Sequence, residues 1–291
     1  MPRFVNRDKQ LRSLLGSCGK TRFRAVSRTY LATLHYDGTG FVGWQRQPAG
    51  RSVQSEFEQV LERLFGQRTV AHAAGRTDAG VHPIGQGVSF SAPAKWQASS
   101  LRRSLNALLP PECWIQSVQA MRPGFHARKS ALTRQYRYDI GTDEASASPF
   151  RRGFEWALGR PLDLSAMQEG ARAISGEHDF RAFAAKRDKP NHRCRILRAE
   201  WGPRPGGRGV SFSIEADRFL HHMVRMLVGT LVDVGLGRRP ADDIQTLLQR
   251  DDNKSTSPPA PAQGLYFVAV TYPPELFDRA EGELRAAALA G

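Results

Sequence analysis

The sequence predicts an α+β protein made of two ferredoxin-like units, each with the element order β-α-β-β-α-β. Three observations predict this fold. Alternating apolar and polar residues mark short strands, apolar residues at helical spacing mark helices, and the same order of elements occurs twice along the 291 residues. We expect the two units to join in one mainly antiparallel sheet with flanking helices and a central cleft.

The first unit begins with an alternating strand at residues 29–36 and a helix at 52–65, in which apolar side chains recur at helical spacing. Short strands follow at 69–74 and 86–92. A helix at 99–109, stopped by Pro110 and Pro111, and a strand at 113–120 complete the unit.

The second unit repeats this order. A strand at 133–140 precedes a helix at 164–174, for which Asp163 is the expected N-cap. The remaining predicted elements are strands at 194–201 and 210–216 around a Pro- and Gly-rich turn, a long helix at 219–234, a short helix at 242–250 and a closing strand at 265–272.

The predicted division of the chain has four parts: a basic arm at 1–28, an N-terminal subdomain at 29–145, a C-terminal subdomain at 146–275 and a tail at 276–291. The arm holds eight Lys or Arg and one acid, Asp8, without sustained periodicity, which indicates a loose segment that touches RNA. A mis-assigned start codon and an Arg-rich import leader are the alternatives.

The charge balance indicates a polyanionic partner. The chain has 42 Lys and Arg against 28 Asp and Glu, a net charge of +14 and a pI near 10.4. Such a surface favours nucleic acid, because neutralising phosphates releases counterions. A general solubility charge is the alternative. The candidate phosphate contacts are Arg102, Arg103, Arg151, Arg152, Lys186 and Arg187.

Cysteine usage and hydropathy bound the class of protein. Cys18, Cys113 and Cys194 are odd in number and far apart, which predicts a reducing compartment rather than a disulfide framework. We expect a cytoplasmic location, and organelle targeting stays open as the alternative. No apolar run reaches the roughly 20 residues of a membrane span. The pair His221-His222 lacks the spacing of a metal site. We therefore expect neither a metal nor a membrane partner.

The densest polar cluster is Gly75-Arg76-Thr77-Asp78-Ala79-Gly80-Val81-His82, between two predicted strands. Its glycines permit tight turns, and a loop on a rigid scaffold is where catalytic residues usually lie. The same residues also fit a β-turn in which Asp78 caps its own backbone. Composition alone leaves both interpretations open.

Six motifs occur in a fixed order along the chain. They are Tyr36-Asp37-Gly38-Thr39 with Phe41 and Gly43-Trp44-Gln45, the cluster 75–82 with Gly85-Gln86, Arg134-Gln135-Tyr136-Arg137-Tyr138, the block 176–183, the stretch 219–231 and Pro261-Ala262 with Gly264-Leu265. Together they closely resemble the TruA family of tRNA pseudouridine synthases over about residues 28–272. Pro83 and Gly87 depart from the family pattern, but neither change removes a reactive group. The resemblance implies the pseudouridine synthase fold.

The resemblance also implies an isomerase that converts uridine to pseudouridine at positions 38, 39 and 40 of the tRNA anticodon stem-loop, working as a homodimer. The reaction exchanges an N1–C1′ bond for a C5–C1′ bond without redox change, so we expect no cofactor. Two rivals stay open. One is a noncatalytic RNA-binding module built from ferredoxin-like units. The other is a hydrolase that uses Asp78 with water and releases uracil.

The resemblance assigns catalysis to Asp78, Tyr136 and Arg225. A carboxylate stabilises or attacks an electron-poor C1′, or removes the C2′ proton. In a closed site it needs a cationic partner to stay ionised. Helical spacing puts Arg225 on a polar stripe that fits a cleft or a solvated face. Tyr136 is expected to hold the uracil ring, and Tyr138 points the same way along its strand. The implied substrate contacts are Arg76, Thr77, His82, Gln86, Tyr136 and Leu265.

Overall fold

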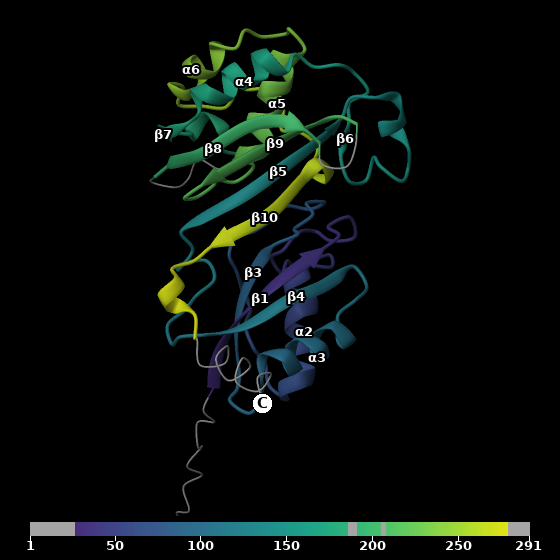
Figure 1. The fold of residues 1–291 in the computed structure, drawn as a ribbon, viewed down its shortest axis with the longest axis vertical. Helices are drawn as coiled ribbons and strands as arrows, with labels where there is room; N and C mark the ends of the chain where they lie inside the picture. The colour runs from purple at the N-terminus through teal and green to yellow at the C-terminus, as the bar shows by residue number, and fades with distance from the viewer. Residues whose placement is uncertain (1–26, 186–190, 205–207, 279–291) are drawn as a thin grey trace, which may run out of the picture.

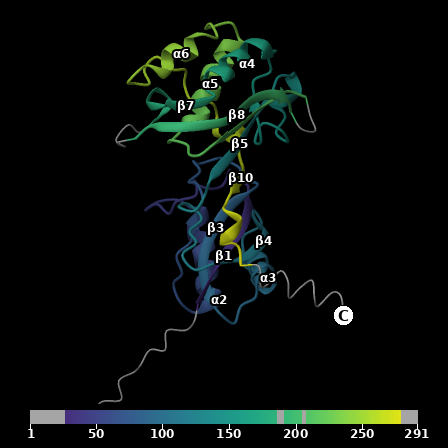
Figure 2. The same ribbon diagram turned by 60° about the vertical axis from the view of Figure 1, so that its left-hand side comes forward.

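The computed structural model describes residues 27–185, 191–204 and 208–278. Two α/β units are stacked along the long axis, and the strands β5 (Thr133–Gly141) and β10 (Leu265–Thr271) cross the middle of the molecule between them (Figures 1 and 2). No helix in these described ranges is long and apolar enough to cross a membrane.

The first unit is a four-stranded antiparallel sheet with two helices on one face. Alternation along its central strand sends Tyr30, Ala32 and Leu34 into the core beneath the helices and Leu31 to the opposite face. The strands lie in the order β2 (His72–Ala73), β3 (Gln86–Pro93), β1 (Ser27–Tyr36), β4 (Cys113–Met121), and the helices are α2 (Val53–Phe65) and α3 (Ala98–Leu108).

Local chemistry fixes both helices of this unit. Ser52 and Ser55 form a capping box that begins α2, and Gly66 ends it in the left-handed conformation at φ 69°. The side chain of Asn106 in α3 makes two hydrogen bonds to the backbone of Ile115 in β4, at 2.9 and 2.7 Å. These bonds hold the helix in register with the sheet.

The second unit has the same plan with an added edge strand. Asp163 caps its first helix as predicted, accepting a hydrogen bond from the backbone of Ala166. The strand order is β10, β5, β9 (Val210–Ala216), β8 (Arg193–Pro203), β7 (Gly176–Asp179), and β6 (Trp156–Ala157) pairs in parallel with β5; the helices are α4 (Leu164–Ala173), α5 (Met223–Gly235) and α6 (Asp243–Leu248). Single 3₁₀ turns lie at Glu144–Ala147, Arg181–Phe183, Ala262–Gly264 and Pro274–Leu276.

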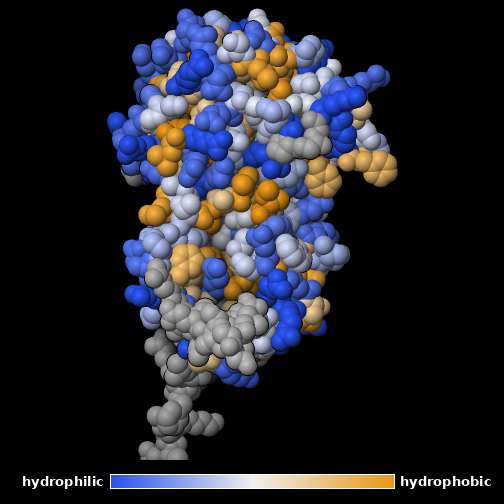
Figure 3. Space-filling view, in the orientation of Figure 1, coloured by the Kyte–Doolittle hydropathy of each residue, from blue (hydrophilic) through white to orange (hydrophobic). Residues whose placement is uncertain are grey.

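The two sheets confirm the predicted α+β class and the repeated unit. The four strands of each repeat, in chain order, are β1, β2, β3 and β4 in the first sheet and β5, β8, β9 and β10 in the second. In both sheets the first of the four lies between the third and the fourth, and the second lies beyond the third. Hydrophobic residues gather at the waist where the units meet, on the face shown in Figure 3.

The junction between the sheets is a short backbone bridge. The segment at 82–84 accepts one hydrogen bond at Pro83 from the Tyr36 amide, at 3.0 Å. On its other side the amides of His82 and Ile84 donate to Leu265 and Phe267 of β10, at 3.0 and 2.9 Å. The predicted single sheet is therefore two sheets, which this segment joins.

Gly85 shows how closely the backbones approach at the junction. A Cβ at this position would lie 1.8 Å from the carbonyl oxygen of Val268 in β10. Only glycine allows that approach.

Three sequence predictions differ from the structure in detail. Strand β5 belongs to the second sheet, so the chain passes between sheets before Thr133, ahead of the predicted boundary at 145. The strand expected at 69–74 is only His72–Ala73. The helix expected from 219 begins at Met223, because His222 takes a left-handed φ of 62°, which an α-helix excludes. Residues 1–26 of the predicted arm and 279–291 of the predicted tail lie outside the described part.

Candidate active site

The loop that carries Asp78 is held from beneath by buried side chains. The Gln86 side chain is fully buried and makes two hydrogen bonds to the backbone of Gly75, at 3.3 and 2.7 Å. The Thr77 hydroxyl bonds to the Tyr36 hydroxyl at 2.5 Å. Because these bonds fix Gly75 and Thr77, which flank Arg76 just before Asp78, the carboxylate is presented from an anchored turn.

A second loop, which carries Gly43 and Trp44 of the N-terminal motif, packs against the loop of Asp78. The Trp44 amide donates to the Thr77 carbonyl at 3.1 Å. Gly43 has φ 105°, and a Cβ there would lie 2.6 Å from the same carbonyl oxygen. Glycine is required here both by conformation and by contact. This packing explains why the motif at 36–45 accompanies the motif at 75–82.

His82 links this loop to the second unit and does not line the pocket. It is 2% exposed. Its Nδ1 accepts from the Gly38 amide at 3.2 Å, so the neutral ring carries its proton on Nε2, which donates to the Gly153 carbonyl at 3.0 Å. Burial lowers the pKa of His82, although Asp37, 3.2 Å from Nδ1, partly opposes this. His82 and Gln86 thus position the loop, whereas the resemblance implied substrate contact.

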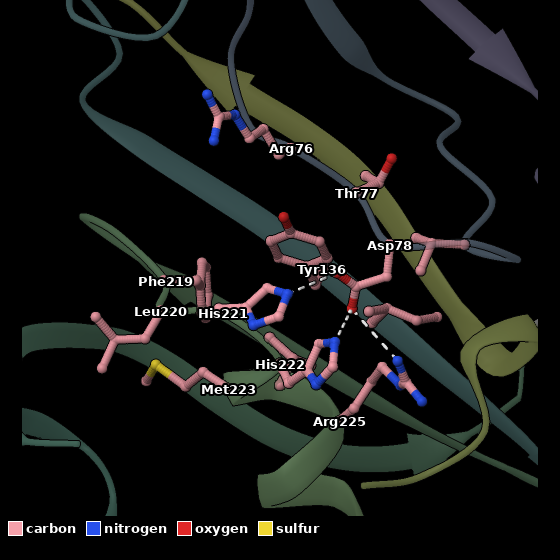
Figure 4. Close-up of a pocket in the computed structure, with 13 residues that line it drawn as sticks. Arg76, Thr77, Asp78, Tyr136, Phe219, Leu220, His221, His222, Met223 and Arg225 are labelled. Atoms are coloured by element: carbon pink, nitrogen blue, oxygen red, sulfur yellow. Dashed lines mark hydrogen bonds and ion pairs between the residues drawn. The ribbon is translucent and has the colours of Figure 1, made fainter. Parts of the chain in front are cut away.

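Asp78 faces a pocket between the two units (Figure 4). The pocket encloses about 400 Å³ of space, including its mouth. The Asp78 side chain is 24% exposed, so the carboxylate is reachable but not freely solvated. The lining residues are Arg76, Thr77, Asp78, Val81, Tyr136, Phe219, Leu220, His221, His222, Met223, Val224, Arg225 and Leu265.

The cationic partner of Asp78 is Arg225, as predicted. Its Nη1 lies 3.3 Å from Oδ2 of Asp78, although the two residues are 147 positions apart in the chain. The Arg225 side chain is 16% exposed, and its Nε donates to the Ala260 carbonyl at 2.7 Å. The Ala260 amide in turn donates to the Arg225 carbonyl at 2.9 Å. The guanidinium is therefore preorganised by backbone on the far side of the pocket.

Two histidines also reach the carboxylate. Nε2 of His222 lies 3.3 Å from Oδ2 of Asp78, and Nε2 of His221 lies 3.6 Å from Oδ1. Their rings stack at 3.9 Å between centroids. The sequence alone gives this pair no role, because it lacks the spacing of a metal site. The adjacent pair before Arg225 was the available signal, but the left-handed turn that aims His222 at Asp78 has no local signature.

The same cluster is the only group of three potential metal ligands within the described residues. One ligand atom each from Asp78, His221 and His222 lies within 4.8 Å of the other two. Arg225 already occupies Oδ2 of the carboxylate with a positive charge. That charge repels a second cation at the same oxygen, so the donor set fits a hydrogen-bonded carboxylate better than a resident metal.

Tyr136 forms one wall of the pocket. Its ring packs edge-on against Phe219 and Phe267, with centroids 4.9 and 5.0 Å away, and it is 8% exposed. Burial raises the pKa of Tyr136, and the negative charge of Asp78 raises it further. The phenol therefore stays neutral. The neighbouring Tyr138 is fully buried, and its hydroxyl donates to Pro261 at 2.7 Å, so it belongs to the core.

The remaining predicted contacts divide by position. Arg76, Thr77 and Leu265 all line the pocket. Leu265 is 5% exposed and packs at the start of β10. Arg76 is exposed, and its guanidinium points away from Asp78 (Figure 4). Together with Asp78, Tyr136 and Arg225, these residues form a partly closed, aromatic-walled site around one carboxylate. A carboxylate held in this way can stabilise or attack an electron-poor carbon.

Comparison with known proteins gives the family. The family model described as tRNA pseudouridine synthase matches residues 32–128 and 171–273. The chain belongs to the tRNA pseudouridine synthase family, and it is an enzyme of the isomerase class.

Individual relatives carry the same description. Proteins named tRNA pseudouridine synthase A from Myxococcus xanthus and Geobacillus kaustophilus are 42% and 40% identical; each match spans 82% of this chain, and 90% and 93% of those proteins. The protein of that name from Frankia casuarinae is 43% identical over 85% of this chain and 91% of its own length. Among solved structures, a chain of the archaeal box H/ACA sRNP Nop10–Cbf5 complex aligns at a TM-score of 0.32 and 11% identity, over 70% of this chain and 44% of that one.

Proposed function

We propose that this protein converts uridine to pseudouridine at positions 38, 39 and 40 of the tRNA anticodon stem-loop, with Asp78 as the group that acts on the ribose. The observation that carries the proposal is the 3.3 Å contact between the Asp78 carboxylate and Arg225 in a pocket walled by Tyr136. An ionised carboxylate of this kind is suited to a C1′ centre that becomes electron-poor.

The reaction balances without a co-reactant. The N1–C1′ bond breaks, the uracil turns, and C5 bonds to C1′. The C5 proton leaves and N1 gains one. Asp78 either bonds transiently to C1′ or removes the C2′ proton and returns it. In both routes Arg225 holds a positive charge 3.3 Å from the carboxylate in a partly closed site.

Tyr136 and Leu265 are suited to hold the detached uracil. Both line the pocket, one with an aromatic ring and one with an aliphatic side chain. The raised pKa of Tyr136 keeps its phenol neutral, so the ring adds no second negative charge beside Asp78. An amphipathic ring can stack on a base and still offer a hydrogen bond from its hydroxyl. Retention of the base between bond breaking and bond forming separates an isomerase from a hydrolase.

The test is release of tritium from tRNA labelled at uridine C5. Wild-type protein should release tritium and produce no free uracil, whereas a hydrolase produces uracil and a noncatalytic RNA-binding module releases nothing. Mapping of the pseudouridines in the product tRNA, nucleotide by nucleotide, then tests positions 38 to 40. Modification confined to another arm of the tRNA contradicts the assignment of the anticodon stem-loop.

The proposal includes a cytoplasmic homodimer that works without a metal or other cofactor. The reaction needs neither an electron carrier nor a Lewis acid, and Arg225 supplies the positive charge beside the carboxylate. Sedimentation measurements test the dimer. Unchanged tritium release after dialysis against a strong chelator tests independence from metals, and activity restored only by an added metal contradicts it.

A further inference from the structure

A second hollow lies beside the catalytic pocket on the N-terminal unit. It encloses about 870 Å³, roughly twice the space of the catalytic pocket on the same measure. We call it the basic groove. The side chains that give it its character are Trp44, His72, Arg76, His126, Arg128 and Lys129.

The cations of the basic groove are not neutralised by the protein. Arg76, Arg128 and Lys129 are exposed and form no ion pair with any acidic residue that the structure describes. No Asp or Glu lines the groove. Other arginines in this chain are paired: Arg151 binds Asp143 and Glu155, for example. An uncompensated group of three cations in a concave site attracts an anion.

The acid beneath the groove is already engaged. Glu58 is 5% exposed, and its carboxylate binds the Gln54 side chain, the Ala71 amide and the Arg46 guanidinium. These partners hold it under the floor of the groove. Its charge therefore does not balance Arg128 or Lys129.

The two histidines give the groove a fixed wall. The rings of His72 and His126 stack at 4.5 Å between centroids, with 26° between their planes. Nδ1 of His126 lies 3.1 and 3.4 Å from the amides of Arg128 and Lys129 and accepts from both. The turn that carries the two cations is thus tied to a ring that is stacked in place. The groove is preorganised rather than a chance gathering of surface charges.

Arg76 connects the groove to the catalytic pocket. It lines both hollows, and it precedes Asp78 by two residues on the same loop. Its guanidinium points away from the carboxylate (Figure 4). A polynucleotide with one base in the catalytic pocket has phosphates as its next charged groups, and Arg76 lies between that pocket and the groove.

We propose that the basic groove binds the sugar-phosphate backbone of the nucleotides that flank the target uridine on one side, with Arg128 and Lys129 at the phosphates and Arg76 at the step between the two hollows. This inference rests on the proposed function, because it places the target base beside Asp78. An acidic protein segment could use the same cations, but it has no reason to be continuous with a pocket for a base. RNA is the occupant that explains both the charge and the continuity.

The experiment measures equilibrium binding of an anticodon stem-loop RNA in which single phosphates are replaced, one at a time, by neutral methylphosphonates. For wild-type protein we expect one or two adjacent positions near the target uridine to weaken binding markedly. For the double variant Arg128→Gln/Lys129→Gln, the same replacements should weaken binding less than twofold. A flat scan with wild-type protein, or equal losses in both proteins at every position, overturns the proposal.

Salt dependence gives a second readout with a matched control. Loss of two phosphate contacts should lower the slope of log affinity against log salt by about 1.4, and the affinity itself on the order of 10-fold at low salt. The control Arg63→Gln/Arg172→Gln removes two exposed charges, one from each unit, and should change the slope much less. Equal changes in the two double variants mean only a general effect of charge, and overturn the groove.

These binding measurements do not need turnover. If wild-type protein binds the stem-loop with the expected scan but releases no tritium, the proposed reaction is wrong and the groove stands. If tritium is released and the scan is flat, the reaction stands and the groove is wrong. Thermal unfolding of each double variant should match that of the wild-type protein, because all four substituted side chains are exposed.

Discussion

The N-terminal and C-terminal units share one strand plan but contribute different things to the site. The N-terminal unit contributes Asp78, on a loop between two strands. The C-terminal unit contributes the groups that surround it: Arg225, His222, Tyr136 and Leu265. The carboxylate that we propose to be reactive and the positive charge beside it are therefore carried by different repeats. One repeat cannot form the site alone.

The hydrophobic cores of the two units also differ, because only the second core takes residues from both halves of the chain. The core of the N-terminal unit is built from residues up to Ile115 and Ala120. The core of the C-terminal unit also includes Leu31, Ala74 and Val81 from the first half of the chain. The loop of Asp78 is thus partly packed into the second unit. The loop of Asp78 is therefore held in place by contacts with both units.

The largest expected effect is on the one reactive group of the N-terminal unit. Asp78→Asn should lower the rate of tritium release by about 10⁴-fold or more, because it removes the nucleophile or base. Binding of tRNA, measured by filter retention, should stay within a fewfold of wild type. Asp251→Asn, at an exposed carboxylate of the C-terminal unit, is the control and should be fully active. Normal turnover by Asp78→Asn would falsify the division of roles.

The next effect tests the support from the C-terminal unit. Arg225→Ala leaves Asp78 without its cation and should lower the maximal rate by about 10²- to 10³-fold while most tRNA affinity is kept. Arg225→Lys keeps a charge but not the bond from Nε to Ala260, so its rate should lie between those of Arg225→Ala and wild type. Arg238→Ala, an exposed ion-paired arginine just after the same helix, is the matched control. A rate for Arg225→Ala equal to this control means that the charge beside Asp78 has no catalytic role.

Two tyrosines on one strand separate substrate contact from core packing. Tyr136→Ala should lower the maximal rate by about 10²-fold through loss of base positioning, and Tyr136→Phe should keep most of it because the ring remains. Tyr138→Phe should instead lower the free energy of unfolding by about 1 kcal/mol, since the Pro261 carbonyl loses its buried donor. Urea titration and single-turnover kinetics measure the two properties. The reverse pattern, with Tyr138→Phe slow and Tyr136→Ala fast, contradicts the assignment.

The smallest effect tests the junction through His82. Burial holds the folded-state pKa of His82 below its ordinary value of 6.5, so the unfolded chain binds more protons between those two values. Stability linked to His82 is therefore complete above pH 6.5 and falls as the pH drops from 6.5 toward the folded-state pKa. Urea midpoints should fall more steeply over this window for wild type than for His82→Gln, after the common acid-dependent change is subtracted. Identical pH dependence in the two proteins would contradict a contribution of His82 to the stability of the junction.

Much of the fold follows from local patterns, because strands alternate and helices repeat regardless of partners. The capped helix at Asp163 and the strand at Val210–Ala216 are where the sequence predicts them. The start of α5 is not, since nothing local demands the left-handed turn at His222. The assignment of Asp78 came from the resemblance, because a glycine-flanked acid also fits a plain turn. The contact between Asp78 and Arg225 joins positions 147 residues apart, and only the packing of the two units specifies it.

The position of β10 in the chain has a consequence for synthesis. This strand bonds to the loop through His82 and Ile84 and supplies Leu265 to the pocket, yet it comes after every other residue of the site. A growing chain that has already folded its first sheet holds Asp78 on a loop that lacks its two hydrogen bonds to β10. The proposed active site can therefore form only after residues beyond 265 have emerged from the ribosome. We expect a polypeptide that ends before β10 to contain Asp78 but to be inactive.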